Sequence, residues 1–218
     1  MQPEHRPTHR DTTLRPSPPC SAAQRLFGRS RSGPITLIPR AIDPIILGAL
    51  DRMQPADFPD VRAEGQGEML RHALEERIQA GALGPDWLAR WLVDDVLFLV
   101  RMFQEISAAR RVLLRLQTVE DDACSRFHTD NVRFRLVSTY RGPGTEWLSP
   151  RAASMAPGRE HLPVAPTYQL ARGDVAIMRG SRDATPECPG VLHRSPPIAG
   201  SGVTRLFLAI DDAADQEY

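Results

Sequence analysis

The spacing of apolar residues divides the chain into two patterns. Between residues 43 and 104 apolar side chains recur every three or four positions, which is the period of a helix with one buried face. Asp43-Pro44 and Gly84-Pro85-Asp86 are typical helix starts, and residues 66–80 form a further segment of the same period. We therefore expect residues 34–109 to form a helical N-terminal part.

After residue 110 the pattern changes to the alternation of a half-buried strand. Several short strands separated by turn residues are typical of a β-sandwich or barrel. A Pro/Ala/Gly loop is expected over residues 149–163. The chain is thus predicted to be an α+β protein in which N-terminal helices pack on a C-terminal β-barrel spanning residues 110–212. The expected strands cover residues 112–119, 132–140, 168–170, 174–178, 190–193 and 205–210.

The two ends of the chain do not fit either pattern. Residues 1–33 are rich in proline and arginine and poor in apolar residues, so they cannot bury enough surface to offset the entropy of ordering them. We expect a disordered tail over residues 1–33 and a short flexible tail over residues 213–218.

Composition limits the classes of function. The net charge is +0, with 27 basic and 27 acidic residues, so no overall charge favours nucleic acid or an anionic membrane. The sequence contains no lysine, which excludes Schiff-base chemistry. Three cysteines without close spacing, no long apolar run and no signal sequence favour a reducing compartment, and we expect the cytoplasm. No nucleophile elbow or phosphate-binding loop is present.

The segment around His128-Thr-Asp130 carries the chemistry that is most specific in this chain. In a strand, residues i and i+2 share a face, so His128 and Asp130 can address one cation together. With His193 they make up a 2-His-1-carboxylate set, the usual holder of non-haem iron(II). If the strand continues, the even-numbered positions as far as Tyr140 share the ligand face, while Arg133 and Arg135 face away.

Arg205 is the candidate for binding an anion. The strand that begins near residue 205 places Arg205 on one face with Phe207 and Ala209, and an arginine that points into a barrel needs an anionic partner. A cosubstrate acid and an internal carboxylate such as Glu146 are both candidates for that partner.

Two other readings of the same residues remain open. Cys124 and Cys188 precede His128 and His193 by four and five residues, so these four side chains could form a Cys2His2 zinc site in a structural or zinc-handling protein. The cysteines could also be small core residues. A third reading is a catalytically silent cupin-like barrel that binds a small acid through Arg205.

The order of the motifs resembles that of the 2-oxoglutarate/iron(II)-dependent oxygenases. His128-Thr-Asp130 is followed by Gly144-Thr-Glu-Trp147, then by Gly173-Asp174, His193 and Arg205. The resemblance covers residues 110–212 and implies a double-stranded β-helix of the jelly-roll or cupin type. It implies that His128, Asp130 and His193 hold iron(II), and that 2-oxoglutarate pairs with Arg205 and accepts a hydrogen bond from Tyr140. The sequence does not indicate which substrate is oxidised.

A closer resemblance rests on "RFHTDNVRFRLVSTYRGPGTEWL" together with "LHRSPP". These stretches look like a bacterial family known as domain of unknown function 1826 (DUF1826), and the likeness is expected to span residues 35–212. This family implies no established activity, so the function must be argued from the site.

Overall fold

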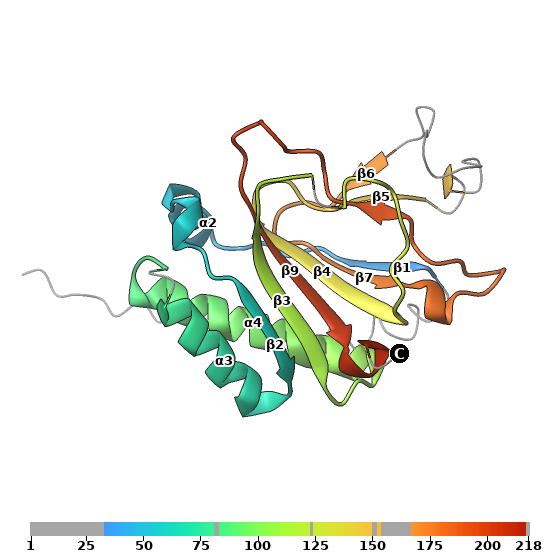
Figure 1. Ribbon diagram of the computed structural model, residues 1–218, viewed down its shortest axis with the longest axis horizontal. Coiled ribbons are helices and arrows are strands. Elements are labelled where there is room, and N and C mark those ends of the chain that lie inside the picture. The colour runs from blue at the N-terminus through green and yellow to red at the C-terminus, as the bar shows by residue number, and fades with distance from the viewer. Residues whose placement is uncertain (1–32, 81–82, 123, 150–151, 154–166, 217–218) are drawn as a thin grey trace, which may run out of the picture.

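The protein consists of two antiparallel sheets and a layer of helices (Figure 1). The computed structural model describes residues 33–216 except 81–82, 123, 150–151 and 154–166. The larger sheet has six strands in the order β1-β7-β4-β9-β3-β2, and the smaller has three in the order β6-β5-β8. The strands are β1 (Ile35–Ile38), β2 (Val61–Gly65), β3 (Val112–Val119), β4 (Phe134–Arg141), β5 (Glu146–Leu148), β6 (Thr167–Gln169), β7 (Val175–Arg179), β8 (His193–Arg194) and β9 (Arg205–Asp212).

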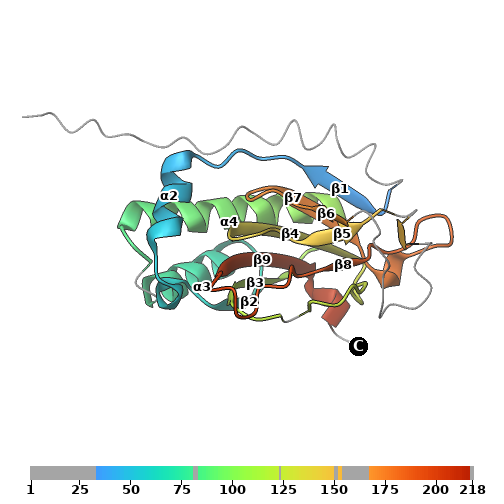
Figure 2. The same ribbon diagram turned by 90° about the horizontal axis from the view of Figure 1, so that it is seen from above.

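Three α-helices lie close to where the sequence places them: α2 (Pro44–Arg52), α3 (Gly67–Ala80) and α4 (Asp86–Ser107). The Asp43 carboxylate caps α2 by accepting a hydrogen bond from the backbone N–H of Ile45 at 2.8 Å. The longest helix, α4, ends at Ser107, because the left-handed backbone of the next residue, Ala108 (φ 59°), stops the helical repeat. Figure 1 shows α3 and α4 on one side of the larger sheet and β5 and β6 on the other, and Figure 2 shows α4 running along that sheet.

The main core lies between α4 and the larger sheet. Alternate residues of β9, namely Leu206, Leu208 and Ile210, are completely buried in this core. The facing stripe of α4 is equally buried, and burying one such side chain stabilises the fold by roughly 1.5–3 kcal/mol. The α4 residues in this stripe are Leu88, Leu92, Val96, Leu99, Val100 and Phe103.

The opposite face of the larger sheet points toward the smaller sheet. Val137 on β4 and Ala209 on β9 are buried there in a second apolar cluster, which Trp147 on β5 also contacts. Two sheets with an interior between them and helices outside are the jelly-roll arrangement that was predicted, so the fold class is confirmed. An isolated bridge between His128 and His193 extends the smaller sheet by one position beyond β8.

The part expected to be helical, residues 34–109, also contains two strands, β1 and β2. β1 pairs with β7, and β2 pairs with β3, so both lengthen the larger sheet at its edges. β2 is a five-residue segment between helices, and its pairing with β3 stabilises it through a long-range contact that helical spacing cannot reveal.

Only part of the two chain ends and of the long loop lies within the described residues. The expected tail over residues 1–33 lies outside the described residues except for residue 33, and so does most of the loop 149–163. Residues 213–216, expected to be flexible, instead form a short 3-10 turn in which Asp215 is buried. Among the described helices, none is long and apolar enough to cross a membrane.

A buried polar contact joins α4, β4 and the segment before α2. The Tyr140 hydroxyl donates to Asp95 Oδ2 at 2.7 Å, and Arg40 Nη1 donates to Asp95 Oδ1 at 2.8 Å. Tyr140 is completely buried, and burial is the main reason why its pKa lies well above the usual value. Both oxygens of the Asp95 carboxylate are therefore satisfied inside the helix–sheet core.

We predict that Tyr140→Phe lowers the free energy of unfolding by about 1–3 kcal/mol, because the variant leaves one buried oxygen of Asp95 without its donor. Urea denaturation followed by circular dichroism measures this change. Tyr168→Phe is the matched control, since half of the Tyr168 side chain is exposed. Equal stability of Tyr140→Phe and wild type would show that the hydroxyl is not needed in the core.

Candidate functional site

Three potential metal ligands meet at the open edge of the smaller sheet. His193 is the first residue of β8, and His128 is bridged to it by two backbone hydrogen bonds of 2.9 Å, one in each direction. Asp130 follows two residues later, in the loop that leads to β4. One ligand atom of each side chain lies within 4.8 Å of the other two. The sequence-predicted set of His128, Asp130 and His193 is therefore assembled by pairing between distant segments.

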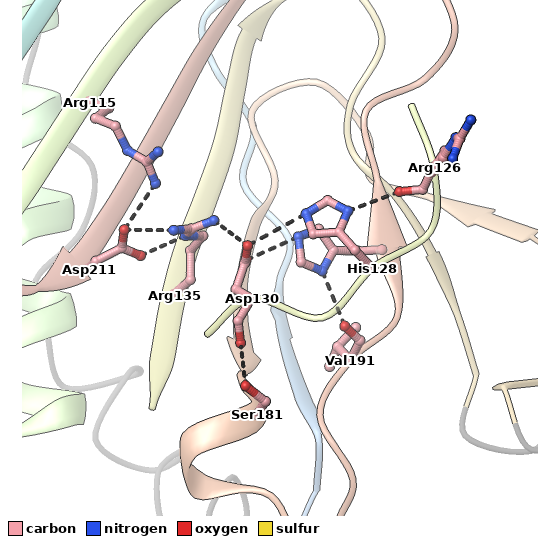
Figure 3. A network of polar contacts seen from close by, with 9 residues as sticks. Arg115, Arg126, His128, Asp130, Arg135, Ser181, Val191 and Asp211 are labelled. Carbon is pink, nitrogen blue, oxygen red and sulfur yellow. Dashed lines mark hydrogen bonds and ion pairs between the residues drawn. The ribbon is translucent and has the colours of Figure 1, made fainter. Parts of the chain in front are cut away.

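Both imidazoles direct the same nitrogen toward the carboxylate (Figure 3). His128 Nε2 lies 3.5 Å from Asp130 Oδ1, and His193 Nε2 lies 3.1 Å from Asp130 Oδ2. The ring centroids of the two histidines are 4.6 Å apart. His193 is buried, while about a third of the His128 side chain is exposed, so the group is reached from the side of His128.

The other nitrogen of each imidazole faces a backbone carbonyl. His128 Nδ1 lies 2.9 Å from the carbonyl oxygen of Arg126, and His193 Nδ1 lies 3.2 Å from that of Val191. A carbonyl only accepts, so each Nδ1 carries a proton and donates it. In a neutral imidazole this leaves Nε2 as a lone pair, and a backbone carbonyl behind the ring is the usual support of a metal-binding histidine.

Because two nitrogen lone pairs and a carboxylate converge, a positive charge between them stabilises the site. Burial by itself would raise the pKa of Asp130, but hydrogen bonds from the protonated imidazoles of His128 and His193 and the nearby Arg135 charge outweigh it and hold that pKa far below its usual range. The hydrogen bond to Asp130 is the largest influence on His128 and raises its pKa. A proton or a metal ion between the imidazoles and the carboxylate satisfies the same electrostatic demand.

The loop that carries Asp130 packs closely against the backbone of Gly180. Gly180 donates its N–H to the carbonyl of Arg133 at 2.9 Å, and Ser181 donates its N–H to the carbonyl of Asp130 at 2.8 Å. A Cβ atom on Gly180 would lie 2.0 Å from the carbonyl oxygen of Val132, so only glycine allows this approach. The position of the carboxylate thus depends on backbone packing between β7 and the loop.

Arg205 lies on the inner face of the larger sheet, as predicted, and is completely buried. Its Nε donates to the carbonyl of Pro143 at 2.8 Å, and Nη1 donates to Ser195 Oγ at 3.0 Å. Its buried Nη2 has no hydrogen-bond partner among the described residues. Burial lowers the pKa of Arg205 to about 10, while the charge of Glu146 acts in the opposite direction.

Two residues assigned near Arg205 have other partners. Glu146 accepts a hydrogen bond from Arg194 Nε at 2.6 Å, so it is not the direct partner of Arg205. Tyr140 lies on the helix-facing side of β4 and donates to Asp95, so its prediction as a cofactor-binding residue is wrong. Its side chain belongs to the core between sheet and helices, on the opposite face from Arg205.

The structure does not assemble the alternative zinc site. In the part of the chain that the structure describes, His128, Asp130 and His193 are the only group of three or more such side chains close enough to hold an ion, and neither cysteine joins it. Cys124 is an exposed thiol in a turn with a positive φ of 59°. Because it is not on a strand, the shared parity with His128 that would have brought its sulfur inward does not apply.

The sequence-based reasoning missed the basic partner of the candidate ligands. It placed Arg135 on the outer face, but residues 131–133 form a bend, and β4 begins only at Phe134. This bend reverses the parity, so Arg135 points inward and its Nη1 lies 2.5 Å from Asp130 Oδ1. Asp211 and Arg115 continue this row of charges. The available signal in the sequence was the alternation of arginine with phenylalanine in Arg133-Phe134-Arg135.

A family model described as "Protein of unknown function (DUF1826)" matches residues 31–211. No curated protein matches the chain. The solved structure of the dioxygenase for auxin oxidation from rice is similar, with a TM-score of 0.52 and 12% identity over 87% of this chain and 76% of that one. The Arabidopsis thaliana enzyme AtDAO1, in a binary complex with 2-oxoglutarate, has a TM-score of 0.51 and 9% identity over 87% of this chain and 86% of that one. At these identities the likeness shows a shared fold.

We predict that Asp130→Asn lowers the pKa of His128, because the hydrogen bond to the carboxylate is the main cause of its elevation. In the metal-free wild type, protonated His128 stabilises the fold below its usual pKa of about 6.5, and this stabilisation is lost as the pH rises through the elevated value. Histidine ring signals in an NMR pH titration measure the shift, with the exposed His72 as internal reference. The same midpoint for His128 in Asp130→Asn and wild type would contradict this account.

Proposed function

We propose that this chain, which belongs to the family described as protein of unknown function (DUF1826), is a 2-oxoglutarate-dependent iron(II) oxygenase. The observation that carries the proposal is the convergence of two imidazole Nε2 atoms and one carboxylate within 4.8 Å. Its substrate is a separate question, because a fold does not specify the molecule that is oxidised.

The donor set fits iron(II) better than a structural zinc ion. Two neutral imidazoles and one carboxylate on one side of an ion form a facial triad, which leaves positions open for other ligands. Structural zinc sites instead close four ligands around the ion and often use thiolates, and neither thiol in the described chain joins the group. The backbone carbonyls behind His128 and His193 keep both rings in the tautomer that ligation requires.

Arg205 supports the assignment of 2-oxoglutarate as cosubstrate. A buried guanidinium with one unpaired nitrogen is costly in free energy unless an anion completes it. Ser195 and the carbonyl of Pro143 hold the other nitrogens, so the remaining one is fixed in direction and suits a carboxylate. The complex of AtDAO1 with 2-oxoglutarate on the same fold agrees with this role.

When bound, iron(II) with 2-oxoglutarate supplies the oxidising chemistry in such a site. The residues of this chain do the positioning. His128, Asp130 and His193 hold the ion at the rim of the small sheet, and Arg205 orients the far carboxylate of the cosubstrate. The apolar cluster around Val137 and Ala209 keeps the interior between the sheets dry.

We predict that wild-type protein loaded anaerobically with iron(II) develops a weak visible absorption band when 2-oxoglutarate is added. His193→Ala should lose iron(II) affinity and therefore the band. Arg205→Ala should keep iron(II) but bind 2-oxoglutarate about 30-fold or more weakly, because losing one partner of a buried charged pair costs about 2 kcal/mol or more. Spectroscopic titration measures both constants.

Arg141→Ala is the matched control for Arg205→Ala. Arg141 lies on β4, donates to the carbonyl of Met53 and stacks over Phe58, so its loss should leave cosubstrate affinity unchanged. Tightly bound zinc with no response to iron(II) and 2-oxoglutarate would overturn the oxygenase proposal. Binding of 2-oxoglutarate without any metal would instead favour a barrel that binds a small acid and does no oxygen chemistry.

A further inference from the structure

We infer that Arg135 is a positioning residue that makes Asp130 present one oxygen, not two, to the metal ion. The inference rests on the proposed function, because it concerns how the same three ligands are used. It starts from an ion pair that the sequence did not predict: Arg135 Nη1 lies 2.5 Å from Asp130 Oδ1, and both side chains are largely buried.

The guanidinium of Arg135 is held by a second carboxylate on the neighbouring strand. Arg135 on β4 and Asp211 on β9 are directly paired positions in the sheet. Nε donates to Asp211 Oδ1 at 2.6 Å, and Nη2 donates to Asp211 Oδ2 at 2.8 Å, which is the two-pronged geometry that fixes an arginine most firmly. With two of its nitrogens on Asp211, the third points in one direction only, and that direction is Asp130 (Figure 3).

Asp211 is itself anchored, which makes the arrangement rigid. It is completely buried, and Arg115 on β3 donates to its Oδ2 at 2.9 Å. Arg115, Asp211, Arg135 and Asp130 therefore alternate in charge across three adjacent strands and the loop that follows the histidine bridge. If Arg135 turned away, the largely buried Asp130 carboxylate would lose its arginine partner.

The consequence falls on the two oxygens of Asp130. Oδ1 is bound by Arg135 at 2.5 Å and lies farther, at 3.5 Å, from His128 Nε2. Oδ2 faces His193 Nε2 at 3.1 Å and has no hydrogen-bond partner among the described residues. A carboxylate can bind a cation through one or both oxygens, and the choice decides how many coordination positions stay open. By engaging Oδ1, Arg135 prevents chelation by Asp130 and preserves a position for the cosubstrate.

A merely structural ion pair would not require this geometry. Arg135 and Arg115 together already neutralise Asp211 in excess, so the contact to Asp130 adds nothing to the pairing of Asp211. Arg133 illustrates the structural case: it lies two residues earlier, pairs with Asp212 and Asp215, and forms no ion pair with His128, Asp130 or His193 among the described residues.

The test compares Arg135→Gln with Arg133→Gln, using Mn(II) as the probe ion. Water-proton relaxation of the Mn(II)-loaded protein reports how many exchangeable waters the ion carries. Arg135→Gln is expected to show one water fewer, because Asp130 is then free to bind through both oxygens. Affinity for 2-oxoglutarate should fall about 10- to 100-fold, because Asp130 then occupies the position that the cosubstrate needs. This is the scale on which metal affinity or activity falls when a residue that supports a metal ligand is lost. Arg133→Gln should match wild type in both measurements.

Arg135→Gln leaves Asp211 with Arg115 alone, so stability must be separated from coordination. The double variant Arg135→Gln/Asp211→Asn removes both charges together and should fold while showing the same loss of one water. An unchanged water number in either folded variant overturns the inference. If the wild-type protein does not bind Mn(II), or if His193→Ala does not abolish Mn(II) binding, the proposed function itself fails. That result differs from an unchanged water number.

Discussion

The arrangement of the whole molecule depends on the two faces of β9. This strand lies between β4 and β3 in the larger sheet, and its side chains alternate between the helix layer and the interior. Leu206, Leu208 and Ile210 bind the helices to the sheet, while Arg205 and Asp211 face the candidate site. A slip of one residue would exchange the two sets, placing arginine in the core and leucine at the site. Burial of the apolar set therefore fixes the register on which the charged set relies.

The charged groups inside the barrel use arginine in a way that lysine could not reproduce. The chain has no lysine, and each inward guanidinium addresses more than one partner at once. Arg135 bridges Asp211 and Asp130, and Arg205 is held by Ser195 and the carbonyl of Pro143 with one nitrogen to spare. The planar guanidinium of arginine holds its partners in fixed relative directions, whereas the ammonium of lysine is a point charge that can rotate among its acceptors.

The sequence predicted the general fold and the three side chains that converge in the candidate site, but it failed where local geometry departs from regular alternation. His128, Asp130 and His193 could be found because residue type and order suffice to recognise them. The directions of the side chains after Asp130 could not be predicted. The bend at residues 131–133 turns Tyr140 toward the helices and Arg135 toward the candidate site. β2 was missed for a different reason: its stability comes from pairing with β3, which no window of the sequence contains. Long-range pairing and loop shape decide both cases.

The candidate site is assembled only while the backbone bridge between His128 and His193, at the edge of the smaller sheet, is intact. The two imidazoles come from distant parts of the chain, and two backbone hydrogen bonds hold their segments together. β8 has only two residues, and such short edges open more easily than long central strands. Each opening separates the two rings, so an ion bound to both would be released when the edge opens and would stabilise the closed edge while it is bound.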